Sequence, residues 1–96
     1  MADLINHEKL TESLNRGVEV VTLIDQMMGL DIFEPMDKAM ILTCKADIEY
    51  TNQCVRDILL GEYAEEELGN VLLKMLTISK GAHDKFNKVC NKYNMQ

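Results

Sequence analysis

The sequence predicts an all-α protein, and three observations lead to that prediction. Apolar residues recur at alternating steps of four and three along three long segments, which is the spacing of one face of an α-helix. Strand-type alternation is almost absent. The chain of 96 residues is 47% hydrophobic but has one proline, five glycines and only 5% aromatic residues, which argues against a β-sandwich or barrel. We therefore expect one helical domain, residues 1–96, with helices near 8–28, 35–60 and 64–93.

The first predicted helix covers residues 8–28. Asn6 is the expected N-cap, because its side chain can accept a hydrogen bond from an early backbone N–H. Gly29 falls where a helix commonly ends in a left-handed residue. The apolar line of this helix comprises Leu10, Leu14, Gly17, Val21, Ile24 and Met28.

The second predicted helix covers residues 35–60. Pro35 is tolerated in a first helical turn, since it has no N–H to leave unpaired. No other glycine or proline occurs before Gly61, which we expect to end a rod about 39 Å long. The predicted buried side comprises Met36, Met40, Cys44, Ile48, Thr51, Val55, Ile58 and Leu59.

The third predicted helix covers residues 64–93. The carboxylates of Glu65, Glu66 and Glu67 suit a helix N-terminus electrostatically. The short connection at 61–63 predicts that the second and third helices form a long antiparallel hairpin, across which the first helix folds. The apolar line comprises Leu68, Leu72, Met75, Ser79, Ala82, Phe86, Val89 and Tyr93.

Apolar residues outside these lines predict self-association. One three-helix protein cannot bury all of them, and large exposed apolar patches usually mark interfaces. We therefore expect a homo-oligomer. The surplus residues are Val18, Val20, Leu23, Ile41, Leu42, Leu59, Val71, Leu73, Leu76 and Ile78.

The cysteines and the N-terminal segment predict an intracellular protein. Cys44, Cys54 and Cys90 are odd in number and lack CxxC spacing, so we expect buried small side chains rather than disulfides or a zinc site. The start, MADLINHEKL, is polar where a secretory leader is apolar. No apolar run approaches about 18 residues, so we expect no membrane segment and a cytoplasmic location.

The sequence gives little support for catalysis. His83-Asp84 lacks the further ligands of a metal phosphohydrolase, and we expect a solvated pair. The ExxD/E motifs that begin at Glu34 and Glu62 would lie at opposite ends of the hairpin, too far apart to share one Mg²⁺ ion. Phosphate-loop, dinucleotide-binding, nucleophile-elbow and zinc-protease motifs do not occur. We therefore expect no catalytic residue, no metal and no cofactor.

Basic residues form two lines despite a net charge of −6, which argues against DNA as a partner. These lines are open to two interpretations: solvated helix faces, or a grip on a small anionic ligand by lysine and arginine. The line on the second helix comprises Lys38, Lys45, Asn52 and Arg56, and that on the third comprises Lys74, Lys85, Lys88 and Lys92.

The segment 35–58, PMDKAMILTCKADIEYTNQCVRDI, resembles the helical hairpin of the phage anti-CBASS sponge proteins. The similarity lies in Lys38-Ala39, in Leu42-Thr43, in the acidic Asp47 and Glu49, and in an aromatic residue two positions before Asn52. The segment 17–27, GVEVVTLIDQM, is similar to the first helix of that family, which ends in an Ile-Asp pair.

The resemblance implies a specific function. Members of that family are small helical oligomers, including hexamers, that hold cyclic di- and trinucleotide immune signals without cutting them and so counteract a bacterial anti-phage defence in the host cytoplasm. It implies that the ligand is held between subunits, in pockets that use an aromatic or polar residue near the N-terminus together with basic residues. The candidate ligand-binding residues are His7, Lys9, Arg16, Lys38, Lys45, Tyr50 and Arg56.

The residues themselves are also compatible with two other functions. A short acidic helical protein can inhibit one host protein by laying an apolar helix face into a groove of that protein. A nucleotide-cleaving enzyme with metal-binding carboxylates is the third hypothesis, and the separation of the two acidic motifs counts against it.

Overall fold

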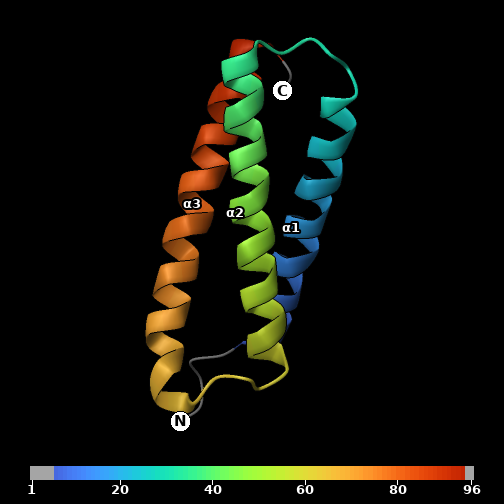
Figure 1. Ribbon diagram of the computed structural model, residues 1–96. Coiled ribbons are helices and arrows are strands. Elements are labelled where there is room, and N and C mark those ends of the chain that lie inside the picture. Colours follow the sequence, from blue (N-terminus) through green and yellow to red (C-terminus); the bar gives the residue numbers. More distant parts are fainter. Residues whose placement is uncertain (1–5, 95–96) are drawn as a thin grey trace.

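A computed structural model describes residues 6–94 as three long helices and one short 3₁₀ turn (Figure 1). The helices are α1 (His7–Met28), α2 (Pro35–Leu59) and α3 (Leu68–Lys92), and the 3₁₀ turn η1 (Glu65–Glu67) leads into α3. No strand occurs in this part of the chain. The prediction of an all-helical chain with three helices is confirmed.

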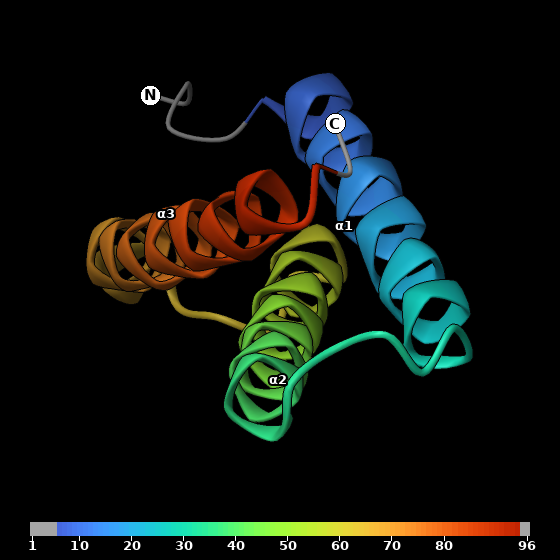
Figure 2. The same cartoon turned by 90° about the horizontal axis from the view of Figure 1, so that it is seen from above.

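The helices α1 and α3 both lie against α2, which occupies the middle of an elongated body of 48 × 19 × 19 Å (Figures 1 and 2). In Figure 1, α3 returns along α2, so that the end of α3 lies beside the start of α2. Within the described residues, no Cα atom of α1 comes within 8 Å of a Cα atom of α3. The backbones of α1 and α3 are therefore not in contact, and α2 forms the floor between them.

The helix ends follow local rules at three of four predicted places. The side chain of Asn6 accepts a hydrogen bond of 3.1 Å from the backbone N–H of Lys9, as an N-cap does. Pro35 occupies the first turn of α2, and Gly61, with φ +76°, follows its end. The prediction for Gly29 is wrong, because its φ is −76°. Its N–H bonds to the carbonyl of Gln26 in a right-handed turn, and the left-handed conformation falls instead on Asp31, at φ 52°.

The buried side of α2 differs from the prediction at its start. Met36 is 80% exposed and Met40 is also exposed, whereas Ile41 is fully buried. The reason is helix geometry: each step of four residues rotates a side chain by about 40° around the axis, so three such steps from Ile48 back to Met36 leave the core by about 120°. Ile41 lies seven residues before Ile48, only about 20° away, and therefore shares its face.

The core consists of two clusters stacked along the long axis. All three cysteines are buried and unpaired, as predicted, and burial raises the pKa of the Cys44 and Cys90 thiols. The cluster near the start of α2 contains Ile24, Met27, Ile41, Cys44, Ile48, Ala82, Phe86, Val89 and Cys90. The cluster near its end contains Cys54, Val55, Ile58, Leu68 and Met75, with Leu10 and Leu14 packed against it.

Several apolar side chains remain outside both clusters, as the surplus of apolar positions predicted. Ile41 is the clear exception, and Val20, Leu59 and Val71 pack against the core in part. The exposed members of the predicted surplus are Val18 (41%), Leu23 (45%), Leu42 (46%), Leu73 (67%) and Leu76 (61%).

A polar cluster fastens the end of α3 to the start of α2. The ammonium of Lys92 lies 2.8 Å from the carboxylate of Asp37, and the Tyr93 hydroxyl donates a 2.7 Å hydrogen bond to the same carboxylate. The Tyr93 hydroxyl also accepts a 3.0 Å hydrogen bond from the backbone N–H of Glu34. Lys92, and after it Tyr93, hold the pKa of Asp37 below its ordinary value. Asp37, in the first of the two acidic motifs, thus takes part in an ion pair between helices.

Candidate functional site

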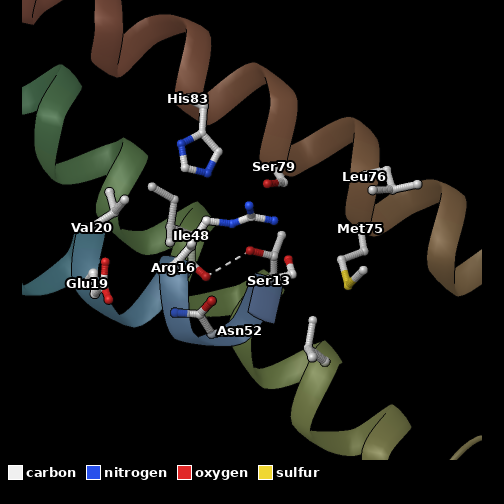
Figure 3. Close-up of a pocket in the computed structure, with 13 residues that line it drawn as sticks. Ser13, Arg16, Glu19, Val20, Ile48, Asn52, Met75, Leu76, Ser79 and His83 are labelled. Atoms are coloured by element: carbon white, nitrogen blue, oxygen red, sulfur yellow. Dashed lines mark hydrogen bonds between the residues drawn. The ribbon is translucent and has the colours of Figure 1, made fainter. Parts of the chain in front are cut away.

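A cavity of about 470 Å³ opens between α1 and α3, above α2 (Figure 3). It lies where the two core clusters meet, because Ile48 of one and Val55 and Met75 of the other form its apolar walls. The volume falls within the range of small-molecule sites, roughly 300–1,000 Å³. The cavity is lined by Ser13, Arg16, Gly17, Glu19 and Val20 of α1, by Ile48, Thr51, Asn52 and Val55 of α2, and by Met75, Leu76, Ser79 and His83 of α3.

Small and polar residues in the three helical lines create this cavity. Gly17 interrupts the apolar line of α1, Ser79 interrupts that of α3, and Thr51 and Asn52 stand between Ile48 and Val55 on α2. None of these side chains is large enough to fill the space between α1 and α3. The core therefore divides at this level, and the gap that remains is lined in part by polar atoms.

Asn52 forms the polar floor of the cavity. It is only 6% exposed, and its amide makes no hydrogen bond with another protein group in the described part of the chain. The atoms of this amide are not fully buried, however, because every fully buried side-chain nitrogen or oxygen among the described residues has a hydrogen-bond partner. Water can therefore reach the amide, and a ligand group that bonds to it takes the place of that water.

Gly17 allows α1 to approach the Asn52 amide. A Cβ atom added at Gly17 would overlap the amide oxygen and lie 2.9 Å from Cγ and 3.1 Å from Nδ2. At Gly81, in the middle of α3, an added Cβ would meet nothing within 4 Å. Packing therefore requires a glycine at position 17, whereas position 81 has room for a larger side chain.

Gly81→Ala is expected to raise the free energy of unfolding by about 0.5–1 kcal/mol, the helix-propensity difference between the two residues. Gly17→Ala carries the same propensity gain but must displace Asn52, so we expect it to fall short of Gly81→Ala by about 1 kcal/mol or more. Urea denaturation at one fixed protein concentration measures both. The double variant Gly17→Ala/Asn52→Ala should recover the lost gain, and equal stabilisation by the two single variants would disprove the contact.

Arg16 is the one lysine or arginine among the lining residues, and it crosses the mouth of the cavity. Figure 3 shows its guanidinium reaching from α1 toward Ser79 and His83 on α3, with the imidazole of His83 pointing toward it. Glu19 brings one carboxylate to the same rim. A guanidinium beside hydroxyl and imidazole groups is suited to a phosphate or carboxylate, because charge-assisted hydrogen bonds are the strongest polar contacts available.

The other sequence-predicted site residues do not join Arg16. Arg56 lines a second, shallower cavity of about 330 Å³ on the other side of Asn52, together with Glu49 and Gln53. Lys45 forms a 2.7 Å ion pair with Asp25, whose hydrogen bond raises the pKa of that lysine. The positive charge of Lys45 is therefore already paired with a carboxylate of α1.

The remaining candidates are spread along the molecule and do not line the cavity. His7 and Lys9 are exposed in the first turn of α1, and Lys38 is half-buried near the start of α2. Tyr50 is 45% exposed, with the ammonium of Lys74 5.8 Å from its ring centre. Of the seven candidates, the structure brings only Arg16 to the larger cavity.

Sequence reasoning missed six of the seven polar residues that line the cavity, among them Asn52, His83 and Ser79. Asn52 was assigned to a polar line with Lys45 and Arg56, and that assignment is wrong because Asn52 is buried. Its spacing is informative: it lies four residues after Ile48 and three before Val55, as a core position does. His83 was expected to be a solvated partner of Asp84, but Asp84 bonds to Lys80 at 3.1 Å and His83 lines the cavity. The signal for Ser79 is its place in the apolar line of α3, where it is the one hydroxyl among core positions between Leu68 and Val89.

Residues 6–94 bring together no group of three histidine, cysteine or acidic side chains that could hold a metal ion. No helix among them is both long and apolar enough to cross a membrane. Comparison with protein-family models, with curated proteins and with solved structures gives no match to this chain.

Proposed function

We propose that this protein is a non-catalytic sponge that binds and sequesters a cyclic di- or trinucleotide in the cavity between α1 and α3. The observation that carries the proposal is that one cavity of about 470 Å³ combines the Arg16 guanidinium, the Asn52 side chain and an apolar wall. A nucleotide offers a partner for each of these three features: a phosphate for the guanidinium, a hydrogen-bonding edge for the amide, and the flat face of a base for the apolar wall. This chemistry, together with the resemblance in sequence, supports a role against a cyclic-nucleotide immune signal in a bacterial cytoplasm.

The proposed contacts divide the ligand into two parts. Arg16 binds one phosphate, and the hydroxyls of Ser13 and Ser79 supply neutral donors beside it. Ile48, Val55 and Met75 pack against a base. We propose that the ligand is released without cleavage.

We further propose that the α2–α3 hairpin assembles into a homo-oligomer whose second copy completes the site. A cyclic dinucleotide carries two phosphates, whereas the cavity has one permanent cation and the carboxylate of Glu19. Leu76 lines the cavity yet is 61% exposed, and Leu73, on the same helix, is 67% exposed. A second copy packed on these leucines would bury them and bring further basic groups to the ligand. A hexamer is the assembly that the resemblance implies.

The test combines calorimetry and light scattering on the full chain. We expect binding of at least one member of a panel of cyclic di- and trinucleotides, a particle of several times 11.0 kDa at micromolar concentration, and recovery of intact ligand after heating. Absence of binding across the panel would overturn the sponge. A linear product in the recovered material would instead indicate an enzyme, and a particle of 11.0 kDa would overturn the shared site.

Inhibition of a host protein is the second candidate, favoured by apolar side chains exposed on all three helices. Met36 of α2 at 80% and Leu73 of α3 at 67% are examples that do not line the cavity. An apolar helix face of this kind is suited to a hydrophobic groove on a partner. A single stoichiometric host protein that co-purifies with the chain, in the absence of any bound nucleotide, would favour this function over the sponge.

A further inference from the structure

Three charged or titratable side chains line the larger cavity within residues 6–94. They are Arg16 and Glu19 of α1 and His83 of α3. The guanidinium of Arg16 stays protonated at every physiological pH, and Glu19 brings a carboxylate. Histidine is the side chain that ordinarily changes its charge near neutral pH. Among these lining residues, His83 is therefore the group that can add a second positive charge beside Arg16.

The imidazole of His83 lies on the α3 side of the cavity and points toward the guanidinium of Arg16 (Figure 3). Ser79 lies four residues before His83, so one helical turn places its hydroxyl on the same face of α3. His83 is half-buried and Arg16 is exposed, so a ligand that enters between them reaches both. These side chains therefore bring donors from two helices to one point at the cavity mouth.

The other charged groups near His83 leave this point open to an anion. On its own helix, the carboxylate of Asp84 pairs with Lys80 at 3.1 Å. On α1, the neighbouring charges are the guanidinium of Arg16 and the carboxylate of Glu19, one of each sign. On α2, the side chains that line the cavity are uncharged: Ile48, Thr51, Asn52 and Val55. A bound phosphate would thus be the main new charge that the imidazole meets.

We propose that His83 is the second cation of the ligand site, and that its imidazole takes up one proton from solvent when a phosphate binds between it and Arg16. The inference rests on the proposed function. A negative charge beside an imidazole favours the protonated ring. Both nitrogens of that ring donate, so the contact does not depend on which nitrogen faces the ligand. The phosphate then accepts charge-assisted hydrogen bonds from α1 and from α3.

Calorimetry of a cyclic dinucleotide in two buffers that differ in ionisation enthalpy, neither of them a phosphate, counts the protons taken up. The phosphodiester groups of the ligand keep one charge state near neutral pH, so the protein gains the proton. We expect the wild type to take up about one-half to one proton per ligand at about pH 7.5. The chain has two histidines, and His7 does not line the cavity. His83→Gln should abolish the uptake and His7→Gln should keep it.

A pH series separates a contact with the ligand from a structural role of His83. Because the bound ring carries the extra proton, the wild-type affinity should rise by about three- to tenfold from about pH 8 to pH 7. Glutamine keeps a neutral donor, so His83→Gln should bind within about threefold of the wild type at about pH 8. At about pH 6.5 it should bind about tenfold more weakly than the wild type. An equal loss at both pH values would overturn the inference.

Sulfate tests the same contact without a nucleotide and without a change at His83. In NMR titrations of the imidazole C2 protons, assigned with His7→Gln, sulfate should move the midpoint of His83 to a pH higher by about 0.5 or more and leave that of His7 in place. Nucleotide binding without proton uptake, or a midpoint that sulfate leaves unchanged, would overturn the role of His83 and leave the sponge intact. A midpoint that sulfate raises, with no cyclic nucleotide bound, would instead support the anion contact and overturn the proposed function.

Discussion

Replacing Ile41 with alanine is expected to lower the free energy of unfolding by about 3 kcal/mol. Ile41 is fully buried in the cluster that joins all three helices, so its truncation leaves a cavity between α1, α2 and α3. Truncation of such a side chain costs roughly 2–5 kcal/mol, according to how far the surroundings collapse. Domains of this size are stable by about 5–15 kcal/mol, so the loss is a large share of the total. Urea denaturation followed by circular dichroism measures it.

Met36→Ala is the matched control for Ile41→Ala. The two residues lie in neighbouring turns of α2, but Met36 is 80% exposed, and we expect a change within about 0.5 kcal/mol. The comparison separates two descriptions of α2, because the simple apolar line of the sequence buries Met36 and leaves Ile41 in the surplus. Equal losses in the two variants, or the larger loss at Met36, would contradict the packing described here.

Arg16→Ala is expected to weaken binding of the cyclic nucleotide by about 10- to 100-fold. Among residues 6–94, Arg16 is the only lysine or arginine that lines the larger cavity, so its loss leaves a phosphate without its charge-assisted partner. Such a contact contributes roughly 1.5–3 kcal/mol, and each 1.4 kcal/mol is a tenfold change in affinity. Calorimetry at constant salt measures the change, and Arg16→Lys should restore part of it, since lysine keeps the charge but not the paired donors.

Arg56→Ala distinguishes the two cavities. Arg56 lies four residues after Asn52 on α2 and lines the smaller cavity of about 330 Å³. With the ligand between α1 and α3, this variant should bind within about threefold of the wild type. A large loss for Arg56→Ala with none for Arg16→Ala would move the ligand to the smaller cavity and refute the assignment of Arg16. Melting curves of both variants ensure that a lost affinity is not a lost fold.

The sequence by itself determined the local structure. The apolar spacing located all three helices, and the Asn6 cap, Pro35 and Gly61 marked ends that the structure confirms. These features depend on residues within a turn or two of one another, so the chain specifies them without its tertiary contacts. The start of α3 differs slightly, because Glu65–Glu67 form a 3₁₀ turn before Leu68. Self-association and the cyclic-nucleotide ligand stay predictions.

Only the tertiary structure decided which positions face the core and which line a cavity. Ile41 rather than Met36 is buried because α1 and α3 both pack against α2. The sequence of α2 alone does not determine which of its faces these two helices cover. Asn52 is polar in sequence yet buried, because Gly17 lets α1 approach its amide. Arg16 and His83 are 67 positions apart and meet only because α1 and α3 flank the same stretch of α2. Periodicity specifies a face of each helix, whereas a cavity depends on the residues at which three faces meet and fail to fill space.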